Sequence, residues 1–307
     1  MAATFALLCL IWGTTWSVIQ IGLSGVPPFS GIAIRFASAS VLLLCVARIL
    51  RVRLGATRVE RRLWLVNGLL AFSVSYGVVY WAEQWIPSSL VAVLFSTYPL
   101  FVALFAHLAL PEEAVRRAEA VGVAAAFAGV AVIFSEDLTA LGGPRAAMAA
   151  AITLLAPIAS AAASVAVKRW GGEVHPLSIT AVPMGIAAGV MAGLALAFER
   201  HRSFTWSSVS VGALIYLSLA GSAVTFSLYY WLLTHLPAKR MALIAYVVPV
   251  VAVAIGVVRG EPLTARILVG AALVIGAVAL AIQSGSGGVT RVARSAESSR
   301  PRPAGRP

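Results

Sequence analysis

Charged residues are scarce in this 307-residue chain, and their scarcity excludes an ordinary soluble domain. Only 11% of the residues are charged, whereas 60% are hydrophobic. A water-soluble domain typically carries about 25% charged residues. There are two cysteines, Cys9 and Cys45, and both fall in apolar stretches, so no disulfide framework is expected. The composition therefore predicts a membrane protein.

Sequence motifs of catalysis are also missing. No HExxH, CxxC, P-loop or GxSxG pattern occurs, and His107 has no second ligand at a spacing suited to a metal. An intramembrane enzyme would need a nucleophile–base pair or a metal cluster, and the sequence shows neither. We therefore expect a protein that is not an enzyme, with no catalytic residue, no metal and no cofactor.

Long apolar stretches recur along the whole chain. A helix of about 20 residues is needed to cross the hydrocarbon core of a bilayer. Ten segments are candidates, at residues 4–23, 29–50, 63–82, 88–110, 118–134, 146–167, 176–198, 204–234, 241–258 and 266–283. The sequence thus predicts an all-α polytopic membrane protein with ten transmembrane helices.

The second half of the chain repeats a pattern of the first half. Five positions recur 150 residues later, namely Tyr80, Trp81, Pro87, Ala92 and Pro99 as Tyr230, Trp231, Pro237, Ala242 and Pro249. The offset then falls to 148, with Glu113 and Gly122 recurring as Glu261 and Gly270. We predict one five-helix repeat in residues 1–143 and a second in residues 144–283, inverted because five is odd. Residues 284–307 should form a disordered basic tail.

Basic residues are unevenly distributed between the two sides of the predicted bundle. Of the 23 Lys and Arg residues, 17 fall on the side of the N-terminus and 5 on the other, while Arg35 lies within a span. The positive-inside rule then places both termini in the cytoplasm and the protein in the cell (inner) membrane. The net charge of +12 does not predict nucleic-acid binding, because the basic residues flank spans and face the lipid bilayer. The sequence leaves open whether the chain is a monomer or a homodimer.

Two charged residues, Arg35 and Glu83, are candidates for a functional charge at membrane depth. Arg35 is about six residues, or roughly 9 Å, inside the outer end of the second span. Glu83 is near the outer end of the third. Charges in spans are costly and usually face a partner or a watery cavity, so both are candidates for binding charge or coupling transport to protons. The alternative is a purely structural ion pair or simple snorkelling. We expect Arg35 and Glu83 to pair in the outer leaflet.

Aromatic and hydroxyl side chains mark the candidate cavity. Ser73, Tyr76, Tyr80 and Glu83 share one face of the third span, and Ser222, Thr225 and Tyr229 share one face of the eighth. Pro99 and Pro249 should break the fourth and ninth spans at mid-membrane depth. The candidates for substrate contact are Trp12, Thr15, Tyr76, Tyr80, Thr97, Tyr98, Thr225, Tyr229 and Tyr246. Packing between helices is the alternative role for these side chains.

Several of these marks resemble the drug/metabolite transporter superfamily, in particular the EamA family of permeases. They are Trp12-Gly13-Thr14-Thr15, Pro28 followed by Arg35-Phe36, Ala82-Glu83 with Pro87-Ser88 before Pro99, and the duplicated Glu-to-Gly spacing at the end of each half. The resemblance covers about residues 4–283. It implies a secondary transporter that exports or exchanges a small metabolite, such as an amino acid or related compound, by alternating access without ATP.

The second half departs from this pattern. Pro183 stands at the position of Arg35 and Leu233 at that of Glu83, so a coupling role would be confined to the first half. A rival hypothesis is a non-transporting membrane scaffold or sensor that signals through the arginine-rich tail. It accounts for the tail but not for the duplicated prolines.

The predicted topology can be tested with reporter fusions or cysteine labelling. Arg53, Lys168 and the tail should be cytoplasmic, and Pro27 and Arg202 should be external, because the excess of basic charge holds the first side inside. Labelling of Arg53 and Arg202 positions from the same side would contradict two inverted five-helix repeats.

Overall fold

The computed structural model describes residues 2–55, 57–109, 117–135, 143–172, 174–229 and 244–285, and these residues form helices without any strand. In the described part of the chain, seven helical stretches are long and apolar enough to cross a membrane: Ala3–Leu23, Pro28–Ile49, Arg58–Ala82, Ser88–Ala109, Ala146–Trp170, Pro176–Phe198 and Ser208–Tyr229. Shorter apolar helices cover Ala124–Ile133, Val247–Val258 and Ala265–Ala277. The prediction of an all-α, multi-span membrane protein is confirmed.

Several of the expected spans consist of more than one helix. In chain order the helices are α1 (Ala2–Leu23), α2 (Pro28–Ile49), α3 (Arg58–Val66), η1 (Asn67–Val74), α4 (Ser75–Ala82), α5 (Ser88–Phe95), α6 (Tyr98–Ala109), α7 (Arg117–Phe134), α9 (Ala146–Thr153), α10 (Leu155–Trp170), α11 (Pro176–Phe198), α12 (Ser208–Ser218), η2 (Leu219–Val224), α15 (Ile244–Val258) and α16 (Ala265–Gly285). The segments η1 and η2 are π-helical.

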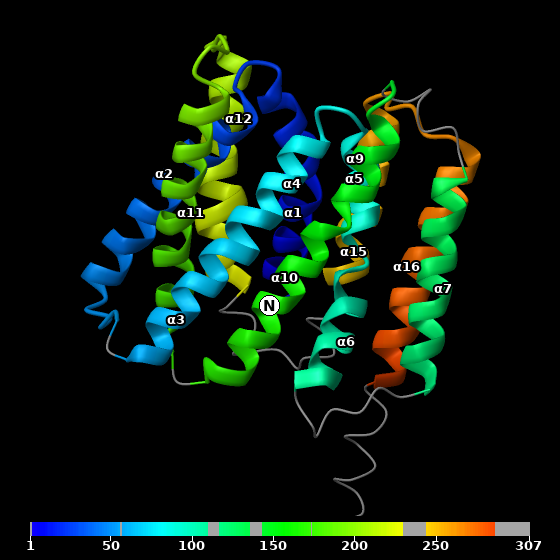
Figure 1. Ribbon diagram of the computed structural model, residues 1–307, viewed down its shortest axis with the longest axis horizontal. Coiled ribbons are helices and arrows are strands. Elements are labelled where there is room, and N and C mark those ends of the chain that lie inside the picture. The colour runs from blue at the N-terminus through cyan, green and yellow to red at the C-terminus, as the bar shows by residue number, and fades with distance from the viewer. Residues whose placement is uncertain are drawn as a thin grey trace, which may run out of the picture.

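The helices lie side by side, and their connections gather at two ends of the bundle (Figure 1). We name them the Pro28 end, where α2 and α5 begin, and the Arg58 end, where α3 and α11 begin. The most extensive packing joins α2 to α11 and α7 to α16, followed by α1 with α15 and α6 with α10. Figure 1 shows α7 and α16 together at one edge. A Cβ atom at Gly270 would lie 2.7 Å from the carbonyl oxygen of Gly129, so glycine is required for this close approach.

The π-helical segments occupy matching places in the two halves. Residues 69–74 of η1 correspond to Leu219–Val224 of η2 at the same offset of 150 that relates Pro99 to Pro249. The Ser73 hydroxyl donates to the Gly68 carbonyl 2.8 Å away, and the Thr225 hydroxyl donates to Ala220, each five residues back. In a π-helix the backbone hydrogen bonds join residues five positions apart instead of four, and such segments occur frequently at functional sites.

The two prolines have different effects on the backbone. Pro99 is the second residue of α6, and Ser96 and Thr97 separate this helix from α5. Helix α15 instead continues through Pro249. A proline has no N–H group and is tolerated in the first helical turn, which explains its position in α6.

Glutamates from neighbouring segments hold the first turns of three helices. Glu199, just after α11, accepts hydrogen bonds from the backbone N–H groups of Phe29 and Ser30 in α2, both at 2.8 Å, and from the Ser30 hydroxyl. The carboxylate of Glu60 accepts a hydrogen bond from the Ser178 hydroxyl at the start of α11. The N-terminus of a helix carries unpaired N–H groups and partial positive charge, which a carboxylate stabilises.

Glu261 makes the third such contact. Its carboxylate accepts hydrogen bonds from the Ser88 hydroxyl at 2.6 Å, the Ser89 N–H at 3.1 Å and the Ser89 hydroxyl, all at the start of α5. The matching Glu113 lies outside the described residues.

We predict that Glu199→Gln lowers the free energy of unfolding by about 1–2 kcal/mol, because it removes the charge that stabilises the first turn of α2. Thermal unfolding of the purified protein in detergent measures the effect. Ser30→Ala removes one donor of the same contact, so the double variant should lose less than the sum of the single losses. Strict additivity would show that the carboxylate and the serine do not act together.

Candidate functional site

Arg35 is fully buried in the second span and is held by acceptors from both halves of the chain. Its exposed fraction is 0%, and its Nε donates to the Ser222 hydroxyl at 2.8 Å. The two terminal nitrogens donate to the Tyr80 hydroxyl at 3.3 Å and to the Gly221 carbonyl at 3.0 Å. A charge buried within a membrane span is tolerated only with such hydrogen bonds.

Aromatic rings cover the guanidinium group. Its central carbon lies 4.9 Å from the ring centroid of Tyr76 and 5.4 Å from that of Phe36. These rings contact each other edge to face at 4.8 Å, and Phe72 contacts Phe36 at 5.3 Å. The faces of aromatic rings attract a cation, so they offset part of the cost of removing Arg35 from water.

The π-helical segment η2 supplies two of the three acceptors of Arg35. Gly221 and Ser222 both belong to η2, whereas Tyr80 belongs to α4. A Cβ atom at Gly221 would lie 3.4 Å from an Arg35 terminal nitrogen and 3.4 Å from the Thr15 hydroxyl oxygen. Arg35 therefore reaches the backbone of η2 at Gly221, with Thr15 in its immediate surroundings.

The expected ion pair between Arg35 and Glu83 is not formed, and that expectation is wrong. Glu83 follows α4 directly and is only 3% exposed, yet neither carboxylate oxygen has a hydrogen-bond partner among the described residues. Glu83 lies one turn beyond Tyr80, about 4.5 Å further along the helix axis. The Tyr80 hydroxyl thus meets the guanidinium in place of the Glu83 carboxylate.

Glu83 lies instead near a polar cluster at the Pro28 end. The charged groups that act on it electrostatically are Glu261, Arg259 and, more weakly, Arg35. Arg259 forms an ion pair with Glu261 at 3.4 Å and donates to the Gln20 side chain at 3.3 Å. Glu83 is thus a buried carboxylate between the Arg35 site and the polar end of α1 and α15.

The other candidate residues form separate groups. The Trp12 ring contacts Tyr229 at 5.4 Å and Phe226 at 5.9 Å. The Tyr98 hydroxyl donates to the Ser164 hydroxyl at 2.8 Å, which links α6 to α10. The hydroxyls of the candidate threonines donate to carbonyls of their own helices, namely Thr15 to Ile11, Thr97 to Leu94 and Thr225 to Ala220.

The structure therefore brings together Arg35, Tyr76 and Tyr80, with Thr15 nearby. The side chain of Tyr246 lies outside the described residues. Sequence reasoning places Ser222 on a polar face of the eighth span but does not identify it as a partner of Arg35. In the described part of the chain, no three His, Cys, Asp or Glu side chains group as metal ligands would.

We predict that Ser222→Ala and Tyr80→Phe each destabilise the protein by about 1.5–3 kcal/mol, because each removes a hydrogen bond to a buried charge. Unfolding of the purified variants in detergent measures the loss. Ser227→Ala is a control for the loss of a serine hydroxyl in the same helical region, since among the described residues its hydroxyl donates to the Ala223 carbonyl at 2.7 Å and not to Arg35. Equal effects of Ser222→Ala and Ser227→Ala would contradict a special role for the Arg35 contact.

Comparison with known proteins agrees with this architecture. The chain matches the model of the EamA-like transporter family over residues 1–135 and again over 147–283. It is 33% identical over 265 residues to YedA of Escherichia coli (strain K12), described as an uncharacterized inner membrane transporter, covering 85% of this chain and 83% of that protein. It is 24% identical over 266 residues to YoaV of Bacillus subtilis (strain 168), an uncharacterized transporter, covering 86% of this chain and 90% of that protein.

A solved crystal structure shares the fold. It superposes with a TM-score of 0.63 at 19% sequence identity and covers 96% of this chain and 98% of the other. The multi-span helical bundle, the two family matches and the related transporters lead to one conclusion: the chain belongs to the EamA-like transporter family.

Proposed function

We propose that this protein is a secondary transporter that exports or exchanges a small metabolite, such as an amino acid or related compound, by alternating access. The observation that carries the proposal is the buried Arg35, which connects α2 and α4 of the first half to η2 of the second. Its acceptors among the described residues are all neutral, so this permanent positive charge is an attractive partner for a polar or anionic group of a substrate.

Alternating access requires two halves that move relative to each other. We propose ten spans in two inverted five-helix repeats, residues 1–143 and 144–283, with both termini and the basic tail in the cytoplasm. The pairing of equivalent helices supports this arrangement, since α2 packs on α11 and α7 packs on α16. The two separate family matches support the same division.

The hydrogen bonds of Arg35 cross the boundary between these halves. A substrate group that accepts hydrogen bonds from the guanidinium would compete with Ser222 and Gly221, and would thereby loosen the contact between α2 and η2. Binding would then favour a different arrangement of the halves, because a ligand shifts a conformational equilibrium by its difference in affinity for the two states. Tyr76 and Tyr80 would contact the bound substrate.

Glu83 is the proposed site of proton coupling. It is buried, it has no hydrogen-bond partner among the described residues, and it lies electrostatically close to both Glu261 and Arg259. A carboxyl group in apolar surroundings next to another carboxylate readily exchanges a proton, as a coupling residue must.

The function can be tested by uptake of radiolabelled amino acids into liposomes that contain the purified protein. Wild-type protein should accumulate substrate when a pH gradient is imposed and should exchange substrate without one. Glu83→Gln should abolish the pH-driven accumulation and leave exchange largely intact, because a side chain that cannot titrate cannot carry a proton.

Glu83→Asp is the matched control, since it keeps a carboxyl group and should retain part of the pH-driven flux. Wild-type accumulation by Glu83→Gln would rule out the coupling role. Absence of both accumulation and exchange for every substrate tested, with a folded wild-type protein, would contradict transport of this class of metabolite.

A further inference from the structure

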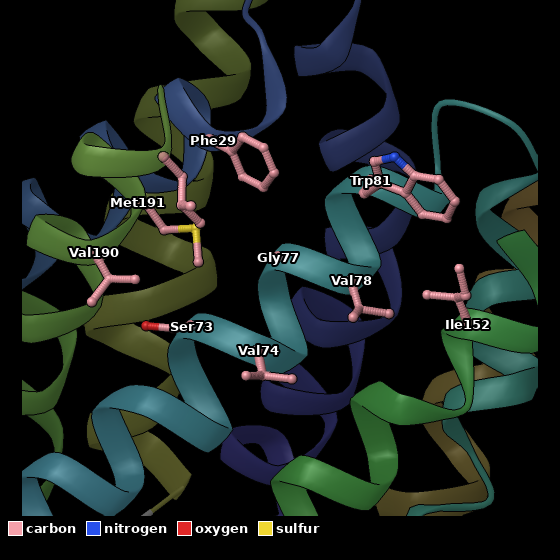
Figure 2. A pocket seen from close by; sticks show the side chains of 10 residues that line it. Phe29, Ser73, Val74, Gly77, Val78, Trp81, Ile152, Val190 and Met191 are labelled. Atoms are coloured by element: carbon pink, nitrogen blue, oxygen red, sulfur yellow. The ribbon is translucent and has the colours of Figure 1, made fainter. Parts of the chain in front are cut away.

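A groove on the membrane-facing side of the bundle carries a feature that the transport site does not use. It has a volume of about 380 Å³ and lies along η1 and α4, with α11 on one side and α9 on the other (Figure 2). Met191 and Ile152 stand on opposite walls, Gly77 is at its floor, and Phe29 and Trp81 are at its Pro28 end. Volumes of 300–1,000 Å³ are typical of ligand sites.

The groove opens on the surface of a membrane-spanning segment. Val74, which lines it, is 42% exposed and lies within the stretch Arg58–Ala82 that can cross a membrane. From Ser73 to Trp81 the groove follows the helix for about 12 Å, at roughly 1.5 Å per residue. One leaflet contributes about half of the roughly 30 Å hydrocarbon core, so this length corresponds to an acyl chain of a single leaflet.

Two arginines stand at the Pro28 end of the groove. The guanidinium of Arg145, directly before α9, lies 4.6 Å from the ring centroid of Trp85. Arg202, shortly after α11, donates to the Gln84 side chain at 3.2 Å, and Gln84 in turn donates to the Trp81 carbonyl at 3.2 Å. The helices that form the walls of the groove thus each place a positive charge next to the turn that follows α4.

These two arginines keep their charge available. Both are exposed, and neither forms an ion pair within the part of the chain that the structure describes. Arginine at a membrane interface attracts anionic lipid headgroups and can hydrogen-bond a phosphate through two N–H groups. The positive charge at the rim suits the phosphate of an anionic phospholipid, and the apolar walls below it suit an acyl chain.

We propose that the groove binds one anionic phospholipid, with an acyl chain along η1 and α4 and the phosphate at Arg145 and Arg202. The bound lipid contacts the flank of η1 and α4 that carries Val74, Val78 and Trp81, next to the face on which Tyr76 and Tyr80 meet Arg35. The site is distinct from the proposed transport site and does not depend on which metabolite is carried.

The proposal is tested by fluorescence quenching in phosphatidylcholine vesicles that contain phosphatidylglycerol with brominated acyl chains. Bromine quenches tryptophan on contact, and the difference between wild type and Trp81→Phe isolates the emission of Trp81. We expect brominated phosphatidylglycerol to quench Trp81 more strongly than brominated phosphatidylcholine does. Trp170→Phe is the control, because Trp170 lies at the opposite end of the bundle. In this variant the difference in quenching between the two brominated lipids should be the same as in wild type.

The arginines are tested by Arg145→Gln and Arg202→Gln, which alter exposed side chains and should not prevent folding. The preference for phosphatidylglycerol should fall about five-fold for each arginine removed, which corresponds to about 1 kcal/mol per charge. Arg200→Gln is the matched control, because Arg200 is exposed nearby but donates to His201. An unchanged preference in the double variant, or equal quenching by both lipids in wild type, would overturn the proposal.

The groove itself is tested by Gly77→Leu. A Cβ atom there would lie 3.3 Å from the methyl end of the flexible Met191 side chain, so the leucine can enter the groove and exclude the acyl chain. Quenching of Trp81 should then be lost, whereas Gly189→Leu, where nothing lies within 4 Å, should retain it. Two results would show that something other than a lipid occupies the groove. Quenching of Trp81 that changes with the protein-to-lipid ratio would indicate a second copy of the chain. Quenching of Trp81 that a transported metabolite reduces would indicate the metabolite.

Discussion

The guanidinium of Arg35 is the interaction on which the interior of this bundle depends. It is fully buried, and its three hydrogen bonds tie α2 to α4 and to η2. Inside a bilayer no water can replace a missing acceptor, so the surrounding helices must adopt positions that satisfy the charge. Gly221 offers its backbone carbonyl to Arg35, with Thr15 close by.

The ends of the helices are held by a different interaction from their centres. Glu199, Glu60 and Glu261 each accept hydrogen bonds at the first turn of a helix to which they do not belong. These contacts fix the termini of α2, α11 and α5 relative to neighbouring segments, whereas π-helical turns occur in the middle of two spans. Of the two π-helical segments, η2 contacts Arg35 directly, at the proposed transport site.

The two halves share a plan but differ in chemistry at the corresponding position of α11. Pro183 occupies the place of Arg35, and its carbonyl oxygen would lie 3.2 Å from a Cβ atom added at Gly68. The Asn67 side chain donates to the Ile179 carbonyl at 2.8 Å in the same region. Close packing and an amide hydrogen bond therefore replace the buried charge. Helix α11 thus keeps a close-packed place against α2 with a proline where α2 carries Arg35.

Much of the architecture could be predicted from the chain alone, since it depends on local composition. Apolar stretches of about 20 residues predict helices that span a membrane, and the recurrence of Pro99 as Pro249 relates the two halves. Arg35 and Tyr80 were recognised as candidates because a charge or a polar stripe within a span is costly. The start of α6 at Tyr98 agrees with the preference of proline for the first helical turn, whereas α15 continues through Pro249.

The hydrogen-bond partners of the buried charges could not be predicted in this way, because they depend on distances between residues that are far apart in the sequence. Spacing along two helices allowed Arg35 to reach Glu83, but the packing of η2 against α2 offers Ser222 and Gly221, 187 and 186 residues away. The same limit applies to Glu261, whose carboxylate meets α5 rather than its own helix. The sequence by itself thus determined which residues must be buried in the membrane and which of them are costly. Only the tertiary structure decided which acceptors meet each charge, since hydrogen bonds form over about 3 Å and helix packing sets positions on that scale.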